Sequence, residues 1–278
     1  MRRNKVGIVG SVYCGSTVLS CVLGAHSKIT NVGEIKELSP KDGDYGRPRC
    51  TPCRSFKKPC PLWDQPWADD LRVGPRIADE ILDHLETPAL VDSSKGWWWF
   101  NQFLNETDSW VFVYLYKSIE EFVASLKMRG GSRYRNLEIT AKIWVRSNKN
   151  CLTFIKNAHK QSSFVYTLSY KDMMTNMKLS LKIILDAMDL SFEEQMLRFW
   201  EVEQHFMSGN TFVASNFPKL EWAVNHDEEF NVARYKERRQ TLFYDDKWKK
   251  VLTADEIKRA NACTGVKQVQ EEIKELLA

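Results

Sequence analysis

The 278-residue chain lacks a strong charge of either sign, a long apolar run, internal repeats and any low-complexity linker. Its 40 basic and 36 acidic residues leave a net charge of +4, a surplus too small to indicate a nucleic-acid partner. No stretch is long and apolar enough to predict stable membrane insertion. The length allows a sizeable core, and we expect one domain over residues 1–278.

An anion-binding loop is predicted near the N-terminus. Residues 5–19 read KVGIVGSVYCGSTVL: an apolar run, a glycine-bearing turn, two hydroxyl residues and an apolar helical pattern. Glycines let a backbone approach an anion, and the first amides of a helix point at it. A nucleotide-triphosphate loop, G-x-x-x-x-G-K-[ST], is a poor match because Ser16 replaces the lysine that would follow Gly15. A strand, turn and helix with small residues chosen for packing alone is the alternative.

The cysteines and the N-terminus bear on the cellular compartment. Seven cysteines are an odd and mostly scattered set, which favours reduced thiols in a cytoplasmic protein. The start, Met1-Arg2-Arg3 and then apolar residues, resembles a secretory signal. Glycines and hydroxyls interrupt that run, and cleavage would remove the predicted loop, so we expect cytoplasmic localisation.

The remaining pattern alternates strands with helices. Strands are predicted at 6–9, 89–91, 111–116 and 164–168, and helices at 118–128, 173–188 and 255–262. This alternation favours a central parallel sheet flanked by helices, whose ligands bind at the carboxyl ends of the strands. Ten tryptophans are mostly expected in the core, although the run Trp97-Trp98-Trp99 suits a pocket or rim.

An insert rich in cysteine and proline is expected at about residues 38–67, and we interpret it as a long loop. Cys50, Cys53 and Cys60 lie within it. A structural zinc site normally has four ligands, and only three cysteines are local. Zinc with a distant fourth ligand, a disulfide and free thiols therefore all remain open, and no metal site is predicted.

Short motifs follow one another in a particular order: Cys14-Gly15-Ser16-Thr17, Gly33-Glu34, Ser93-Ser94-Lys95, Lys117 with Ser125, Tyr170-Lys171-Asp172-Met173 and His205-Phe206-Met207-Ser208-Gly209-Asn210. In this order and spacing the chain resembles the sulfotransferases that use 3′-phosphoadenosine 5′-phosphosulfate (PAPS), most of all their bacterial-type and tyrosylprotein-type branches. The resemblance runs from Lys5 to about Trp248. It implies a single α/β domain with a P-loop-like sulfotransferase fold.

The resemblance also implies how the cofactor is held. The 5′-phosphosulfate would lie on the loop formed by Tyr13, Cys14, Gly15, Ser16 and Thr17. Tyr13 stands where the family has lysine or arginine, so the loop lacks its usual cation.

A 3′-phosphate motif is implied farther along the chain. The family has an arginine at a strand end and a serine eight residues later, and here these positions hold Lys117 and Ser125. Arg129 lies on the same helix face as Ser125 by its i, i+4 spacing and could supply the planar fork that a lysine lacks. Both cations could instead be solvated surface residues.

Three residues are candidates for catalysis. Glu34 matches the Gly-Glu that supplies the general base in the tyrosylprotein branch, although it could be an ordinary surface residue. Lys95 is the best remaining cation for the leaving oxygen. His205 matches the start of the family's H-x-x-G-G-N box and is a rival base.

The resemblance implies in-line transfer of a sulfuryl group from PAPS to a hydroxyl, or to an amine, without a metal. The acceptor would be a small molecule, a glycan or a peptide, and neither its identity nor the oligomeric state is predicted. A PAPS- or PAP-binding protein that has lost catalysis is the second hypothesis, since Tyr13 and Lys117 both depart from the pattern (PAP is 3′-phosphoadenosine 5′-phosphate). A nucleotide kinase is a weaker third hypothesis.

Overall fold

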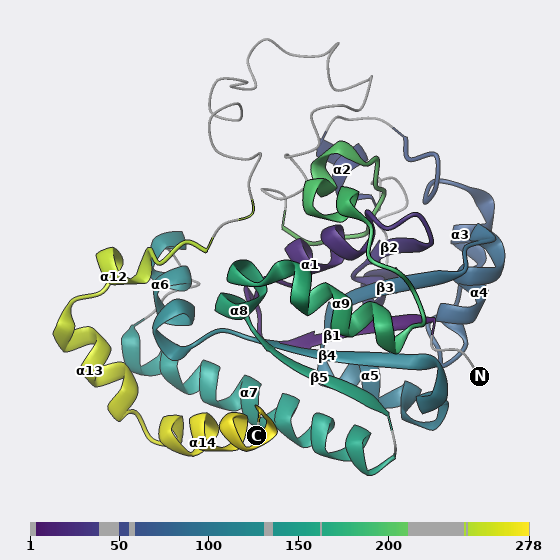
Figure 1. Ribbon diagram of the computed structural model, residues 1–278. Coiled ribbons are helices and arrows are strands. Elements are labelled where there is room, and N and C mark those ends of the chain that lie inside the picture. The colour runs from purple at the N-terminus through teal and green to yellow at the C-terminus, as the bar shows by residue number, and fades with distance from the viewer. Residues whose placement is uncertain are drawn as a thin grey trace, which may run out of the picture.

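A five-stranded parallel sheet forms the centre of the protein (Figure 1). The computed structural model describes residues 4–38, 50–55, 59–130, 136–161, 163–210, 242 and 244–277, with the side chains of 55 and 106–108 excepted. The strand order is β2-β3-β1-β4-β5, and every pairing is parallel. The strands are β1 (Lys5–Gly10), β2 (Ile29–Gly33), β3 (Ala89–Lys95), β4 (Trp110–Tyr116) and β5 (Phe164–Ser169).

Both faces of this sheet are buried, as is usual where helices connect parallel strands. In β4, Trp110 and Phe112 belong to the core on one face, and Val111 and Val113 to the core on the other, because successive side chains of a strand point to opposite faces. The expected α/β class, a parallel sheet flanked by helices, is confirmed.

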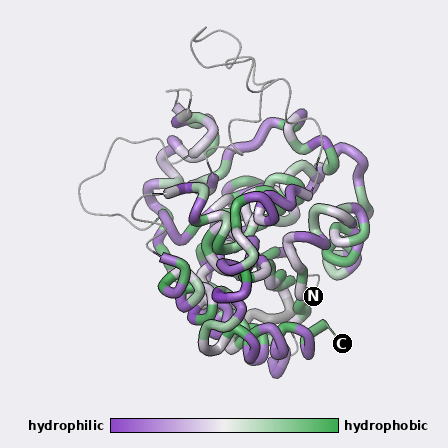
Figure 2. The backbone as a smooth tube through the Cα atoms, turned by 90° about the vertical axis from the view of Figure 1, so that its left-hand side faces the viewer, coloured by the Kyte–Doolittle hydropathy of each residue, from purple (hydrophilic) through white to green (hydrophobic). Residues whose placement is uncertain are grey.

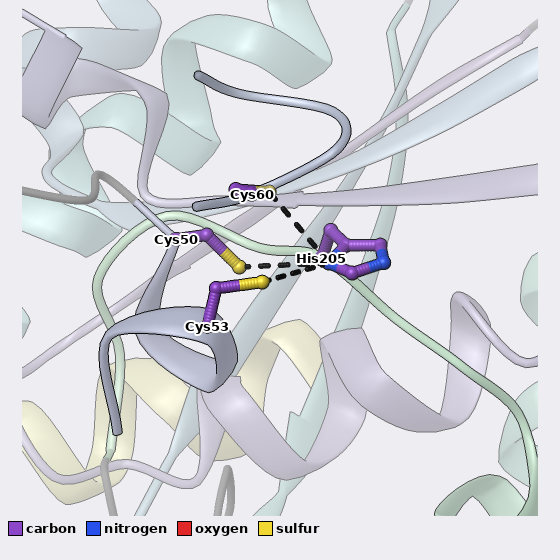
Figure 3. A group of neighbouring side chains, drawn as sticks. All are labelled: Cys50, Cys53, Cys60 and His205. Carbon is purple, nitrogen blue, oxygen red and sulfur yellow. Dashed lines mark hydrogen bonds between the residues drawn. The ribbon is translucent and has the colours of Figure 1, made fainter. Parts of the chain in front are cut away.

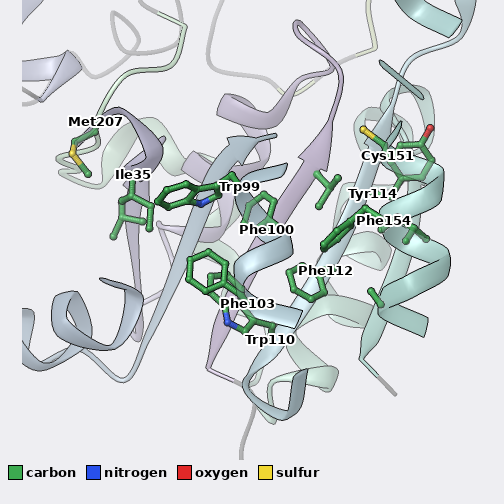
Figure 4. Close-up of a cluster of buried hydrophobic side chains, with 14 of the residues drawn as sticks. Ile35, Trp99, Phe100, Phe103, Trp110, Phe112, Tyr114, Cys151, Phe154 and Met207 are labelled. Atoms are coloured by element: carbon green, nitrogen blue, oxygen red, sulfur yellow. The ribbon is translucent and has the colours of Figure 1, made fainter. Parts of the chain in front are cut away.

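One face is covered by a larger set of elements, which surround an aromatic cluster around Phe100 and Trp110 (Figure 4). The rings of Trp110 and Phe112 stack with centroids 5.7 Å apart. These elements are α4 (Ile77–Leu85), α5 (Trp97–Phe100), η2 (Asn101–Ser109), α6 (Ile119–Arg129), α7 (Leu137–Lys160), α13 (Ala254–Ala262) and α14 (Val266–Leu277).

The opposite face is covered by α1 (Ser16–Leu23), α8 (Tyr170–Thr175), α9 (Met177–Ala187) and η4 (Glu194–Glu201). The remaining short elements are η1 (Ile35–Leu38), α2 (Thr51–Ser55), α3 (Pro66–Asp70) and α12 (Trp248–Val251). Within the insert at about 38–67, residues 39–49 and 56–58 lie outside the described part.

Local signals explain several helix boundaries. Ser118 caps α6 through the amide of Glu121, whose carboxylate in turn accepts from the Ser118 amide, which is a complete capping box. The helix predicted over 173–188 is divided at Asn176 into α8 and α9. Hydrophobic residues recur between hydrophilic ones along α14 (Figure 2), and Val266, Val269 and Ile273 of this helix are buried.

The tryptophan run is divided between core and surface. Trp99 is 2% exposed, whereas Trp97 and Trp98 are 37% and 58% exposed. Within the described residues, no helix is both long enough and apolar enough to cross a membrane.

Candidate functional site

The candidate site residues come together at the carboxyl edge of the sheet. Glu34 follows β2, Lys95 ends β3, the loop 11–15 follows β1 and Lys117 follows β4. Since β3 and β4 are the two neighbours of β1, Lys95 and Lys117 end the strands on either side of the loop. Ligands of open parallel sheets bind at this edge, beside the strand where the chain reverses its direction of winding.

The loop itself has a backbone suited to an anion. Tyr13 and Gly15 adopt left-handed conformations with φ of 64° and 106°. Alternation of left- and right-handed residues lets successive amides converge on one point, and the first amides of α1 add the positive end of a helix. Ser16 and Thr17 are the first residues of α1 and are 3% and 7% exposed.

Gly15 is required for two reasons. Its φ disfavours any residue with a side chain, and a Cβ placed there would lie 2.7 Å from the ring of Tyr170. Tyr170, the first residue of α8, thus packs against the loop.

Cys14 lies at the base of the loop and is fully buried. Burial raises the pKa of the Cys14 thiol, while the charges of Lys95 and Lys117 act in the opposite direction. Both lysines therefore contribute positive potential at the base of the loop.

Glu34 is held between two lysines. Its carboxylate forms an ion pair with Lys95, and both side chains are nearly buried. Lys36 Nζ lies 3.2 Å from the other carboxylate oxygen of Glu34 and donates to the carbonyl of Ser94 at 2.9 Å. The sequence did not single out Lys36; its position two residues after Glu34 was the only available signal.

The turn that presents Lys95 is fixed by buried hydrogen bonds. Lys95 has a φ of 63°, and the Gly96 amide donates to the Ser94 carbonyl across it at 2.7 Å. Asp92 accepts from the Ser94 amide at 2.8 Å and from Trp99 Nε1 at 2.6 Å. Burial raises the pKa of Asp92 to about 6, against these hydrogen bonds. Left-handed backbone at a non-glycine residue is costly, and such residues concentrate at functional sites.

Lys117 and Ser125 meet on the other side of the loop. Lys117 Nζ donates to Ser125 Oγ at 3.2 Å and lies 4.2 Å from the centre of the Tyr170 ring. Burial lowers the pKa of Lys117, and the carboxylate of Glu121 partly offsets this effect. Tyr170, from the motif Tyr170-Lys171-Asp172-Met173, therefore contributes an aromatic ring beside Lys117.

Arg129 is brought to the loop as well. Its guanidinium carbon lies 4.3 Å from the centre of the Tyr13 ring, a cation–π arrangement. Arg129, the last residue of α6, thus places a positive charge over the ring of Tyr13 in the loop.

The segment 203–210 forms the outer wall beside β2. The Glu34 amide donates to the Met207 carbonyl at 2.7 Å, and the Met207 amide donates to the Val32 carbonyl at 3.2 Å. Farther along, the Asn210 amide donates to Thr17 Oγ1 at 3.1 Å. This segment therefore touches both Glu34 and the start of α1.

His205 lies in this wall segment, but both nitrogens of its ring have partners other than Glu34 or the loop. Its Nδ1 lies beside the thiols of Cys50, Cys53 and Cys60, and its Nε2 pairs with Glu203 at 2.9 Å.

The fold is that of known sulfotransferase domains. The sulfotransferase domain of the Synechococcus PCC 7002 olefin synthase matches with a TM-score of 0.56 and 18% identity over 94% of each chain. The sulfotransferase domain from the curacin biosynthetic pathway matches with a TM-score of 0.55 and 16% identity, covering 94% of this chain and 97% of that one. No family model and no curated protein matches the sequence.

Proposed function

We propose that this protein transfers a sulfuryl group from PAPS to an acceptor hydroxyl, or to an amine. One observation carries the proposal: Lys95 and Lys117 stand on either side of an anion-type loop, at the carboxyl edge of a sheet with the sulfotransferase fold. Lys95 and Lys117 suit a ligand with two anionic groups, one bound on the loop and the other bound beside the loop.

The 5′-phosphosulfate would lie on the loop. The amides at the start of α1 and the hydroxyls of Ser16 and Thr17 would donate to its oxygens. Lys95 would neutralise the bridging oxygen that leaves.

The 3′-phosphate would lie near Lys117, Ser125 and Arg129. Arg129 extends from the end of α6 to the ring of Tyr13 in the loop. We assign it chiefly to the 3′-phosphate, where a guanidinium can bind two oxygens at once.

The transfer step needs a base and a leaving-group cation. The acceptor oxygen attacks sulfur, the bond from sulfur to the bridging phosphate oxygen breaks, and PAP leaves with that electron pair. The acceptor proton would pass to Glu34, in preference to His205, whose two ring nitrogens have partners elsewhere. The Glu34–Lys95 ion pair would open as Lys95 turns to the leaving oxygen.

The acceptor would approach near Trp97 and Trp98. These exposed rings begin two residues after Lys95, beyond Gly96, and offer a stacking surface for an aromatic or carbohydrate acceptor.

Thermal shift assays test the cofactor. We expect PAP to raise the melting temperature and AMP to raise it far less, because AMP lacks the 3′-phosphate. Arg129→Ala should weaken PAP binding by about 1.5–3 kcal/mol, the contribution of a hydrogen bond to a charged group. Arg146→Ala, an exposed arginine on α7, is the matched control and should bind PAP normally. Equal shifts with PAP and AMP would contradict the 3′-site.

The affinity for PAP should depend on pH through Lys117. Because burial lowers the pKa of Lys117, the free protein loses this charge at a lower pH than an ordinary lysine would. The affinity should therefore fall as pH rises through that lowered pKa, by up to about tenfold per pH unit. Lys117→Arg should remove the fall, since arginine stays charged. Titration calorimetry above pH 7, where the phosphates no longer change charge, measures this; the same fall in Lys117→Arg would exclude Lys117.

A binding protein without catalysis is the second candidate, favoured by the uncharged Tyr13 in the loop. It predicts PAP binding with the selectivity described above but no sulfuryl transfer to any acceptor class.

A further inference from the structure

Four potential metal ligands from two distant parts of the chain meet beside β2 (Figure 3). Cys50 precedes α2 and Cys53 lies within it, and Cys60 follows in the same insert. His205 comes from the wall segment, 145 residues after Cys60. The three sulfurs and the Nδ1 nitrogen all lie within 4.8 Å of one another. All three cysteines are reduced and nearly fully buried.

The spacing of these atoms suits a tetrahedral ion. Nδ1 lies 3.3, 3.6 and 3.8 Å from the sulfurs of Cys53, Cys60 and Cys50. Zinc bonds of about 2.3 Å to sulfur and about 2.0 Å to nitrogen separate tetrahedral S and N ligands by about 3.5 Å. One disulfide among the three thiols would leave a sulfur and an imidazole without a role, whereas a metal uses all four ligands.

The groups around the ligands have the arrangement that metal sites use. Glu203 accepts from His205 Nε2 at 2.9 Å, which leaves Nδ1 as the free lone pair. The Trp63 amide donates to the Cys60 sulfur at 3.3 Å, and Trp63 Nε1 donates to the His205 carbonyl at 2.7 Å.

We propose that Cys50, Cys53, Cys60 and His205 bind a structural zinc ion. Three thiolates and one imidazole are a ligand set that zinc favours, and four protein ligands leave no open position for catalysis. The three cysteines are recognisable from their spacing in the sequence, whereas only the fold brings His205 to them.

The zinc ion would hold the wall of the candidate active site in place. Two residues after His205, Met207 pairs with both Gly33 and Cys50. The Thr51 hydroxyl donates to the Ser208 carbonyl at 2.8 Å, and Asn210 reaches Thr17. The ion would thereby tie the insert to the backbone that contacts Glu34 and the start of α1.

Metal analysis of the full chain tests the proposal. Protein expressed with added zinc should contain about one zinc ion per chain, as a four-ligand structural site requires. Cys53→Ser and His205→Ala should lose it, whereas Cys263→Ser, at the distant C-terminal end of α13, should keep it. Glu203→Gln should weaken zinc binding by about 10–100-fold, the usual effect of removing a partner of a metal ligand.

If these variants fail to fold, the proposal can be tested on the unmodified protein. A zinc chelator should expose Cys50, Cys53 and Cys60 to alkylation, read by mass spectrometry, before the buried Cys14, Cys21 and Cys151 react. The proposal would be overturned if the protein contained no zinc, or iron in place of zinc. It would also be overturned if Cys53→Ser kept a full equivalent of zinc, or if the chelator did not change the alkylation. Chelation should also weaken PAP binding; that effect rests on the proposed function, whereas zinc content does not.

Discussion

Lys95→Ala is expected to lower sulfuryl transfer about 10²–10³-fold, because the departing phosphate oxygen loses its main electrostatic partner. Folding should be unaffected, since alanine meets the same backbone strain at a φ of 63° as lysine does. Single-turnover rates with saturating PAPS measure the loss directly, and circular dichroism checks the fold.

Lys36→Ala is the matched control for that experiment. It removes a second lysine from Glu34 but leaves the cation that we assign to the leaving oxygen. A much smaller loss than in Lys95→Ala is expected. Full activity in Lys95→Ala, or equal losses in both variants, would show that the leaving-group cation is another residue.

Glu34→Gln should reduce turnover by about 10²–10⁴-fold, because the amide keeps the shape of the side chain but cannot accept the acceptor proton. PAP affinity should barely change. Comparing the transfer rate with the dissociation constant for PAP separates this loss of chemistry from a loss of binding.

Glu37→Gln provides the control, since Glu37 lies three residues away in η1 and is 40% exposed in its side chain. It should transfer sulfuryl groups normally. Near full activity in Glu34→Gln would show that another residue takes the acceptor proton and that the tyrosylprotein-type comparison misassigned the base.

The sequence predicts some strands and helices and not others, for a physical reason. The predicted strands are continuous apolar runs, which a doubly covered parallel strand requires. The sequence does not predict strand β2, because Thr30 and Asn31 interrupt its apolar pattern. Asn31 is nevertheless buried, since it donates to Gln204 and accepts from the Gly33 amide. Helix α7 was missed for a similar reason: it buries Asn148, which accepts a hydrogen bond from Tyr114.

Sequence by itself determined the features that depend on near neighbours. The strand, the glycine turn and the helix that begins at Ser16 follow from local backbone preferences, and the capping box of α6 lies within four residues. Ser125 lies eight residues after Lys117, about two turns into the helix that follows the strand end. Their proximity is therefore also predictable from the sequence.

Only the tertiary structure decided which distant side chains meet. The parallel order β2-β3-β1-β4 brings Glu34 to Lys95 and places a lysine on each side of the loop. The end of α6 lays Arg129 over Tyr13, and the wall segment carries His205 to three cysteines about 150 residues earlier. Spacing along a chain fixes local geometry alone, whereas these contacts depend on how the sheet and its connections pack.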